Sequence, residues 1–133
     1  MKLTRASSYA LHAVEYMAAN KVQKPLASHH IAEARGIPER FLLKVLKPLV
    51  SARVLHSVKG PNGGYRLARP ASKITMLEVV EAVDGPIRGQ SPLSGGPSNG
   101  AIERKLENIC KQMADATRKH LEKVHVSDLM GKR

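Results

Sequence analysis

Residues 31–69 read IAEARGIPERFLLKVLKPLVSARVLHSVKGPNGGYRLAR, and this stretch is the one that decides the predicted fold. A short helical pattern ends at Gly36, since glycine readily adopts the left-handed conformation that closes a helix. A second helical pattern begins near Pro38, which suits the first turn of a helix. Two helices joined by so short a turn predict a helix-turn-helix motif.

The second of these helices has two chemically different sides. Apolar residues recur at the three- and four-residue spacing of one helix face; they are Phe41, Leu42, Val45, Leu46, Leu49 and Val50. Arg40, Lys44 and Lys47 lie on the other side. An apolar face that anchors the helix and a basic face left outside are what a helix needs to enter a DNA groove. Pro48 removes a backbone hydrogen bond, so we expect a kink or an early end near Lys47.

Two short strand patterns follow, at residues 54–60 and 64–69, and a glycine-rich loop separates them. Asn62-Gly63 is a strong hairpin signal, because both residues tolerate positive φ. The loop matches neither GxxxxGK[ST] nor GxGxxG, so a nucleotide site is not predicted. A hairpin directly after a helix-turn-helix predicts a wing, with Lys59, Arg66 and Arg69 placed to meet DNA. A tight turn without a binding role is the alternative.

Capping signals place the helices around this motif. Thr4 is an expected N-cap for a helix over residues 4–20, and Ser28 for the helix that ends at Gly36. Thr75 and Glu78 have the spacing of a capping box at the start of a mostly buried helix. The predicted fold class is mainly α with a small β-hairpin (α+β), with a winged helix-turn-helix domain over residues 1–84.

The composition changes after residue 84. In residues 85–100, eleven of sixteen are Gly, Pro or Ser, which predicts a flexible linker. A long helix then begins a C-terminal segment over residues 101–133. The helix carries a narrow apolar seam with heptad-like spacing; its positions are Ile102, Leu106, Ile109, Met113, Ala116 and His120. Such a seam favours dimerisation with an identical chain, and packing on the chain's own domain is the alternative.

The chain is strongly basic. Its 133 residues contain 22 Lys and Arg against 11 Asp and Glu, a formal net charge of +11. Nine basic residues lie between Arg35 and Lys73, and Glu39 is the only acid among them. This excess predicts a polyanionic partner, either nucleic acid or an anionic membrane surface. Since no signal peptide or membrane span is recognised, we expect double-stranded DNA as the partner and a cytoplasmic location.

Catalytic and metal-binding patterns are not found. Cys110 is the only cysteine, and one thiol forms no intramolecular disulfide and holds no iron–sulfur cluster alone. His29 and His30 are adjacent, so on a helix they point in different directions and do not readily chelate one ion. No nucleophile lies near a base and an orienting acid. We therefore expect no enzyme, no metal site and no cofactor, with Cys110 a packed thiol or, alternatively, an intermolecular disulfide.

These residues resemble the Rrf-two family of bacterial winged-helix transcription regulators. The resemblance rests on MKLTRASSYALHAV at residues 1–14, on residues 31–70 and on ITMLEVVEAVDG at residues 74–85. The wing, close to RGPGGGY in the family, is the most specific motif. The resemblance covers residues 1–84 well, and the later linker, long helix and VSDLM ending follow the family's plan. It implies a homodimer with long helices crossed at the interface and two winged helices on one palindromic operator.

The resemblance also implies particular DNA contacts. In the family the start of the recognition helix reads base edges in the major groove, which here are Pro38, Glu39, Arg40, Phe41 and Leu43, followed by Lys44 and Lys47. The wing enters the minor groove, and its residues here are Lys59, Gly60, Pro61, Asn62, Gly63, Gly64, Tyr65 and Arg66. Thr4, Arg5 and Ser28 resemble the family's phosphate contacts.

The chain departs from the cluster-binding members of the family. Those members carry three closely spaced cysteines in the linker, whereas residues 88–107 here contain no cysteine and no histidine. Pro92, Ser98, Arg104 and Glu107 stand where ligands would be expected, so no cluster is predicted. In the cluster-binding members an acidic residue of the recognition helix tunes which base is bound, and Leu43 stands at that position here. We expect a cluster-free homodimeric repressor; the alternatives are a protein-interaction module and a regulator that responds to a small effector or to redox through Cys110.

Overall fold

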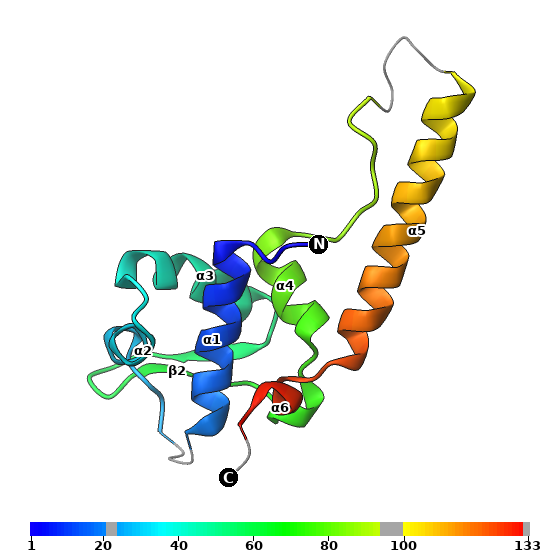
Figure 1. Ribbon diagram of the computed structural model, residues 1–133. Coiled ribbons are helices and arrows are strands. Elements are labelled where there is room, and N and C mark those ends of the chain that lie inside the picture. The colour runs from blue at the N-terminus through cyan, green and yellow to red at the C-terminus, as the bar shows by residue number, and fades with distance from the viewer. Residues whose placement is uncertain (21–23, 94–99, 132–133) are drawn as a thin grey trace.

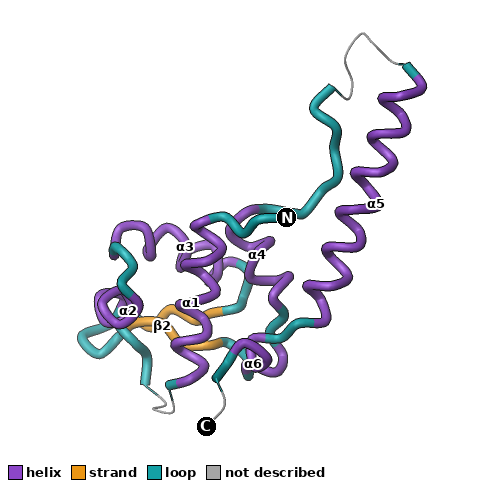
Figure 2. Tube along the Cα trace, viewed as in Figure 1, coloured by secondary structure: helices purple, strands orange, loops and turns teal. Residues whose placement is uncertain are grey.

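The computed structural model describes residues 1–20, 24–93 and 100–131 of the chain. Helices make up most of it, and one antiparallel hairpin supplies two strands (Figures 1 and 2). The elements are α1 (Arg5–Ala19), α2 (Ser28–Arg35), α3 (Glu39–Ser51), β1 (Leu55–Val58), β2 (Gly64–Leu67), the short 3-10 helix η1 (Ala71–Lys73), α4 (Met76–Asp84), α5 (Ala101–Lys123) and α6 (Val126–Leu129). This architecture confirms the predicted fold class.

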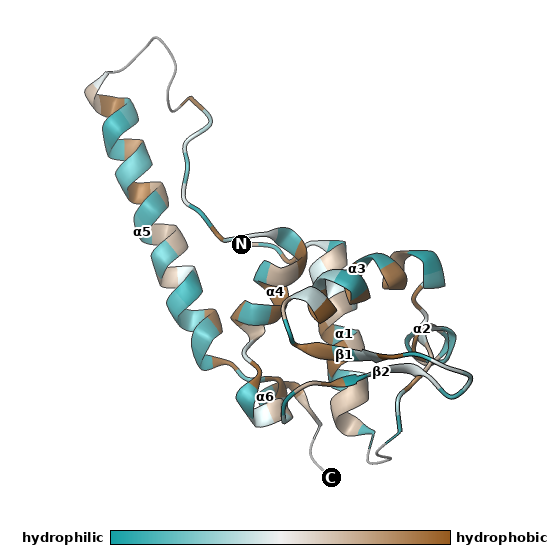
Figure 3. Ribbon diagram, turned by 180° about the vertical axis from the view of Figure 1, so that it is seen from behind, coloured by the Kyte–Doolittle hydropathy of each residue, from teal (hydrophilic) through white to brown (hydrophobic). Residues whose placement is uncertain are grey.

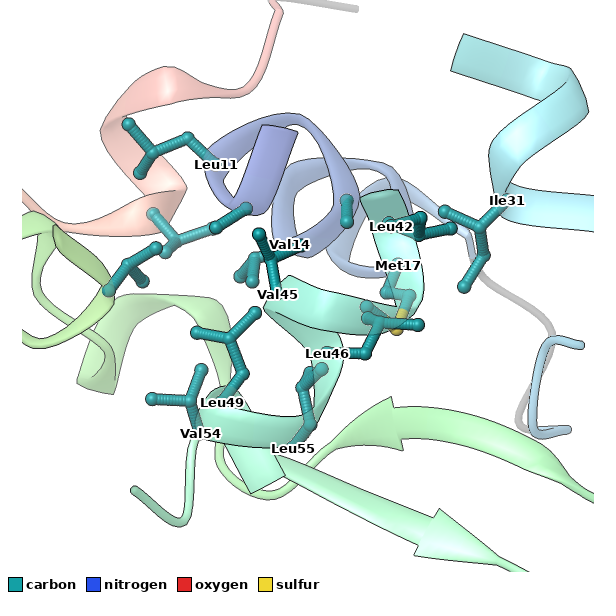
Figure 4. Close-up of a cluster of buried hydrophobic side chains, with 14 of the residues drawn as sticks. Leu11, Val14, Met17, Ile31, Leu42, Val45, Leu46, Leu49, Val54 and Leu55 are labelled. Atoms are coloured by element: carbon teal, nitrogen blue, oxygen red, sulfur yellow. The ribbon is translucent and has the colours of Figure 1, made fainter. Parts of the chain in front are cut away.

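Helix α1 is central to the core. It contacts α2, α3, α4 and α6, and it also lies against β2. Figure 4 shows Val14 of α1 close to Val45 of α3, with Leu46, Leu49 and Leu55 continuing the cluster toward the hairpin. The side chains at this interface are aliphatic, as expected for a chain with only 3% aromatic residues. Burial of this apolar surface is what holds the helices and the hairpin together.

The first helix is capped as the sequence predicts. Thr4 Oγ1 accepts a hydrogen bond from the Ser7 N–H at 3.0 Å, which satisfies one of the free donors of the first turn. The same hydroxyl lies 2.8 and 2.9 Å from the two carboxylate oxygens of Asp84, at the end of α4. Ser7 Oγ donates a third hydrogen bond to Asp84 at 2.6 Å. The cap therefore also joins the start of α1 to the end of α4.

The turn between α2 and α3 is as predicted, but its capping differs at Ser28. Gly36 ends α2 with φ +64°, in the left-handed region. Ala27, and not Ser28, is the N-cap of α2, and no side chain caps this helix. Ser28 is the first helical residue, and its hydroxyl donates to Glu39 Oε2 at 2.7 Å. Pro38 is the N-cap of α3, one residue before the helix begins.

Helix α3 continues through Pro48. It ends at Ser51, so an early end near Lys47 is wrong. Leu46 and Leu49, on either side of the proline, have no exposed surface. The free energy from burying these two side chains exceeds the cost of one lost backbone hydrogen bond, because full burial of a leucine contributes about 1.5–3 kcal/mol.

The hairpin has the predicted strands but a different turn. Strands β1 and β2 pair antiparallel with Leu55 opposite Leu67 and Val58 opposite Gly64. A hydrogen bond of 2.9 Å from the Gly63 N–H to the Gly60 carbonyl closes a tight turn with Pro61 and Asn62 at its centre. Gly60 and Gly64 have positive φ, at +111° and +156°, whereas Asn62 and Gly63 do not. The two-residue turn at Asn62-Gly63 is therefore wrong, because proline supplies the preset φ of the first central position.

Helix α4 begins with the predicted capping box. Glu78 N–H donates to Thr75 Oγ1 at 3.1 Å, and Glu78 Oε2 accepts from the Thr75 N–H at 2.8 Å. Arg69 forms an ion pair of 2.5 Å with the same carboxylate. Leu77, Val79 and Val80 are buried along the helix, and most of its other residues are half-buried.

The chain reaches α5 through a segment that lies against it. Residues 85–93 form neither helix nor strand, as predicted, but Ser91 is buried and its N–H donates to Glu107 Oε2 at 3.0 Å. Its hydroxyl donates to Glu103 Oε1. Arg118 of α5 pairs with Glu81 of α4 at 2.6 Å. The remaining linker residues 94–99, including Ser98, lie outside the described residues, and the predicted division into three segments stays a prediction.

The C-terminal segment returns to the first domain. Met76 N–H donates to the Val124 carbonyl at 2.7 Å, and Val126 N–H donates to the Ile74 carbonyl at 2.9 Å. Val126, in α6, is 1% exposed and belongs to the core around α1. Figure 1 shows α5 projecting from the rest of the molecule, with α6 back beside α1. The tail that follows the long helix thus completes the core of the winged domain.

Candidate nucleic-acid interface

Helix α3 presents a basic, partly apolar face to the outside. Arg40, Lys44 and Lys47 are exposed, whereas the opposite side buries Leu42, Val45, Leu46 and Leu49. Phe41 and Leu43 are also exposed, at 37% and 43%. The two-sided helix is as predicted, except that Phe41 lies outside the core. Phe41 belongs to the surface that the resemblance assigns to base contacts.

The aromatic ring of Phe41 lies among cations. The Arg40 guanidinium carbon is 4.7 Å from the ring centroid, and the Lys44 ammonium nitrogen is 5.7 Å from it. Both separations fall within the range of cation–π attraction, which limits the freedom of the two long side chains. The start of α3 therefore carries two positioned cations and one exposed apolar ring.

Ser28 and Glu39 are brought together by a direct hydrogen bond. Ser28 opens α2, and Glu39 opens α3, so the bond holds the first turns of two successive helices side by side. Glu39 is also the only acid in the basic stretch from Arg35 to Lys73. Two of the residues named as DNA contacts by the resemblance thus form one polar unit.

The wing is attached to the rest of the domain by a backbone pair that sequence reasoning missed. Tyr65 N–H donates to the Leu26 carbonyl at 2.8 Å, and Leu26 N–H donates to the Tyr65 carbonyl at 2.9 Å. A Cβ at Gly64 would lie 2.3 Å from the Leu26 carbonyl oxygen, so only glycine allows this approach. Leu26 lies in a short stretch without helical or strand periodicity, and nothing in that stretch signals the pairing.

The tip of the wing is exposed from Lys59 to Asn62, and Arg66 is exposed on β2. Gly63, Gly64 and Tyr65 are half-buried behind the tip. A groove separates α3 from the hairpin; its lining residues are Leu43, Lys47, Val50, Ser51, Ser57 and Tyr65. The structure therefore places two residues of the predicted helix surface, Leu43 and Lys47, beside one wing residue, Tyr65.

Thr4 and Arg5 lie at the start of α1 and are exposed. The Thr4 hydroxyl is already engaged by Asp84 and Ser7. Thr4 therefore has a clear structural function as a cap and as a bridge to α4, whatever its part in phosphate binding.

Two of the nine basic residues between Arg35 and Lys73 have structural partners. Arg35 pairs with Glu15, contacts His12 Nδ1 at 3.2 Å and lies 5.3 Å from the Tyr16 ring centroid. Arg69 pairs with Glu78 and donates to the Lys73 carbonyl at 2.8 Å. The other seven form no ion pair with a carboxylate in the parts of the chain that the structure describes; they are Arg40, Lys44, Lys47, Arg53, Lys59, Arg66 and Lys73.

The Arg69–Glu78 pair shifts the ionisation of the acid. Partial burial opposes the charged form of Glu78, but hydrogen bonds from Arg69 and Thr75 outweigh it and lower the pKa of this carboxyl below 4.5. The pair links the end of the hairpin to the start of α4.

The predicted dimer seam is exposed along α5. Ile102, Leu106, Ile109 and Met113 are 70%, 41%, 49% and 58% exposed, and Ala116 and His120 are exposed as well. Figure 3 shows apolar bands on the otherwise hydrophilic ribbon of α5. The side facing the chain instead buries Glu103, Ala114 and Leu121. The alternative that the seam packs on its own domain is therefore wrong.

Cys110 lies on the side of α5 that faces residues 85–93. It is half-buried, and a Cβ at Gly89 would lie 2.0 Å from its carbonyl oxygen. No group of three or more His, Cys, Asp or Glu side chains gathers within metal-binding range in residues 1–20, 24–93 and 100–131.

Comparison with known families identifies the class of protein. A family model described as Rrf2, iron-dependent transcriptional regulator, matches residues 3–132. Because the match spans nearly the whole chain, the chain belongs to the Rrf2 family. It is a winged helix-turn-helix transcription regulator and not an enzyme.

Individual relatives agree with this family. The protein aau3 of Rhizobium meliloti is 44% identical over 84 residues, which are 63% of this chain and 54% of that protein. The aligned segment thus covers about half the length of aau3. The HTH-type transcriptional regulator IscR of Vibrio campbellii is 28% identical over 130 residues, 98% of this chain and 77% of IscR.

Solved structures share the fold. CymR, the global cysteine regulator of B. subtilis, superposes with a TM-score of 0.75 at 24% identity, over 97% of this chain and 95% of CymR. The oxidized form of Staphylococcus aureus CymR gives a TM-score of 0.74 at 26% identity, over 100% and 98% of the two chains. Within its described parts, this chain contains no helix that meets the length and hydropathy needed to cross a membrane.

Proposed function

We propose that this chain is a sequence-specific DNA-binding repressor that acts as a homodimer on a palindromic operator. The observation that carries the proposal is the exposed face of α3, where Arg40, Phe41, Leu43 and Lys44 stand without structural partners in the core. Nucleic-acid readers combine cations for phosphates and base edges with apolar groups for thymine methyls. The exposed face of α3 offers cations and apolar groups together, and an α-helix has the right size to enter a major groove.

The wing supplies the second contact. Lys59 begins the exposed tip of the wing, and Arg66 follows the tip on β2. A basic residue on a narrow hairpin fits the minor groove, whose negative potential attracts cations. Thr4, Arg5 and Ser28 are proposed as phosphate contacts, as are the exposed lysines of α3.

The homodimer is proposed through α5. Four large apolar side chains exposed on one stripe of a helix are unusual for a monomer, because their exposure forgoes hydrophobic stabilisation. The stripe has the spacing of a coiled-coil seam, so a second copy of the same helix covers it best. Two winged domains held by this pair would match two half-sites of a palindrome.

An iron–sulfur cluster does not fit the donors present. Glu107, at one of the expected ligand positions, accepts a hydrogen bond from the Ser91 backbone, while Pro92 and Arg104 offer no suitable donor atom. Iron–sulfur clusters are held chiefly by thiolates, and the chain has one cysteine, Cys110. We therefore propose a cluster-free regulator. Protein prepared anaerobically should be colourless with substoichiometric iron, and a brown protein with bound iron would contradict this.

DNA binding is tested by selecting genomic fragments and measuring affinity at several salt concentrations. If about eight phosphates are neutralised per dimer, log K should fall against log salt with a slope near −7. Lys59→Ala should weaken binding and reduce the magnitude of that slope by about 2 per dimer, one for each wing. Lys111→Ala, which removes the same charge from an exposed site on α5, is the matched control. No bound fragment, or a slope near zero, would refute the proposal.

The dimer is tested separately by light scattering. Met113→Asp places a charge in the centre of the seam and should give monomers, because an unpaired carboxylate resists burial. Asn108→Asp adds the same charge to an exposed position of α5 outside the seam and should leave the dimer intact. A dimer that persists in Met113→Asp places the interface elsewhere.

Two alternatives remain testable with the same protein. If the exposed face of α3 binds a protein instead of DNA, a captured partner should compete with DNA for Arg40 and Lys44. If Cys110 senses redox, Cys110→Ser should abolish any effect of mild oxidant on DNA affinity. An oxidant effect that survives in Cys110→Ser excludes the thiol.

A further inference from the structure

A pocket lies on the flank of the wing, between the end of α1 and the outer edge of β2. Its volume is about 560 Å³, within the range of small-molecule sites. Its lining includes Met17 and Ala18 of α1, Lys24, and Arg66, Leu67 and Pro70 from the hairpin and the residues after it. The pocket borders β2, whereas the groove beside α3 borders the other side of the hairpin and shares only Tyr65 with it.

The charges around this pocket have one sign. Lys24, His56, Arg66 and Arg69 line it, and no Asp or Glu does. Arg69 is neutralised by Glu78, but Lys24 and Arg66 form no ion pair with a described carboxylate. His56 and Arg66 lie directly opposite each other on the two strands, so their side chains are neighbours. Gathered cations without a counter-charge favour an anionic occupant.

The backbone adds a donor to the same pocket. Ala68 N–H donates to the Val54 carbonyl toward β1, at 2.9 Å. Backbone groups alternate in direction along a strand, so the N–H of Leu67 points to the outer edge, as that of Tyr65 does toward Leu26. Leu26 covers the edge at Tyr65, and Leu67, two residues further along the strand, also lines the pocket. An amide N–H directed into a cationic pocket suits an oxyanion.

Apolar residues also line the pocket. Met17 and Ala18 come from α1, and Pro70 and Ala71 follow the hairpin. A fully hydrated inorganic ion would leave this surface unused, whereas an organic acid would cover it. We propose that the pocket binds a small organic carboxylate, with its charge at Lys24, Arg66 and the Leu67 N–H and its hydrocarbon part against Met17, Ala18 and Pro70.

The position of Arg66 gives the ligand a consequence for DNA, and this step rests on the proposed function. Arg66 is a proposed DNA contact and also lines the pocket. A carboxylate that pairs with Arg66 competes with a DNA phosphate for the same guanidinium. The two ligands therefore weaken each other's binding to an equal degree, because coupling between sites is reciprocal.

Binding is tested first without DNA, by NMR spectroscopy of the full chain labelled with nitrogen-15. Benzoate and octanoate are the probes, and benzamide and octanamide are their uncharged controls. The acids should shift the backbone amide signals of Leu67 and Ala68 with saturation, and the amides should not. Shifts spread over α3 and the wing tip, or equal shifts with chloride, would show general anion attraction and overturn the proposal.

Two variants locate the site. Lys24→Gln should weaken carboxylate binding about tenfold, as loss of one charged hydrogen bond predicts; Lys73→Gln, an exposed lysine outside the pocket, should not change it. Ala18→Leu fills the pocket with a good helix former and should abolish binding, while an otherwise unchanged spectrum confirms folding. Unchanged affinity in both Lys24→Gln and Ala18→Leu overturns the site.

The coupling is tested last. Saturating benzoate should lower DNA affinity of the wild-type chain and leave that of Ala18→Leu unchanged. An equal effect on both proteins refutes the coupling and leaves the pocket assignment intact. Conversely, a chain that binds no DNA refutes the proposed function, while the amide shifts still decide whether the pocket is real.

Discussion

Gly64 is the residue at which the wing meets the segment before α2. The backbone pair between Tyr65 and Leu26 brings that segment against Gly64, so the space for a side chain is taken by carbonyl and amide atoms. Its φ of +156° is also unusual for any residue other than glycine. One position thus sets how firmly the wing is held against the domain.

Gly64→Ala should destabilise the domain by about 1–3 kcal/mol, because the new Cβ forces the Leu26 backbone to move. The expected measurement is a thermal midpoint several degrees lower, with weaker DNA binding through a displaced wing. Asn62→Ala, at the exposed tip and without positive φ, is the matched control and should be close to wild type in stability. Equal midpoints for the two variants would contradict the close approach.

Glu78 is a second single residue that matters for stability, because its ionisation makes the free energy of unfolding depend on pH. Its pKa is lower in the folded protein than in the unfolded chain, so the unfolded chain binds more protons near that pKa. The stabilisation is therefore present above about pH 4.5 and is lost as the pH falls through the lowered value. Glu78→Gln should flatten the decline of the thermal midpoint in this acid range. Glu122→Gln, at an exposed site of α5, should retain the wild-type slope.

At the scale of elements, α3 combines a strong pattern with one unfavourable residue. The spacing of Leu42, Val45, Leu46 and Leu49 places them all in the core, and this burial carries the helix through Pro48. The proline still lacks the N–H that would bond to the Lys44 carbonyl. The helix is therefore held by tertiary packing in spite of its local sequence.

Pro48→Ala should stabilise the protein by about 1–2 kcal/mol, since it restores a donor and removes a residue with very low helix propensity. Chemical denaturation should show a higher midpoint with an unchanged slope. Lys47→Ala, one residue earlier on the same helix, should have little effect on stability even if it weakens DNA binding. A loss of stability in Pro48→Ala would show that the ring's contacts beside Ala52 and Ala82 matter more than the missing bond.

At the scale of the whole molecule, the chain leaves the winged domain at α4 and returns at α6. The return is fixed by backbone bonds on either side of Thr75 and by the burial of Val126 in the core. Helix α5 is therefore anchored at its C-terminal end, and through Glu81 and Arg118 also to α4. Helix α5 carries the exposed seam and is attached to the winged domain at both points. The geometry of a dimer formed through this seam would therefore set the spacing of its two recognition helices.

Val126→Ala should destabilise the winged domain by about 1–3 kcal/mol, although residue 126 lies beyond the long helix. The loss follows from a cavity beside α1, and thermal unfolding measures it. Leu129→Ala removes a larger side chain from the same short helix, but Leu129 is 41% exposed and should cost much less. If the two substitutions cost the same, α6 does not complete the core.

Local sequence patterns were sufficient to predict much of the fold. Thr4, Gly36 and the Thr75–Glu78 pair could be interpreted correctly because capping depends on neighbouring residues alone. The amphipathic spacing of α3 and the hairpin were predicted for the same reason. The N-cap at Ser28 and the turn at Asn62-Gly63 were wrong, because the Ser28 hydroxyl donates to Glu39 instead and Pro61 takes the first central position of the turn.

The sequence by itself determined the class of the protein: a helix-turn-helix, a glycine-rich wing, a basic surface and a long helix with an apolar stripe. These follow from periodicity, charge and turn residues, which act over a few positions along the chain. Only the tertiary structure decided that Arg35 and Arg69 are held by acids, that Phe41 lies outside the core and that Val126 lies within it. Burial and ion pairing depend on which distant segments meet, and that information is not contained in any local stretch of sequence.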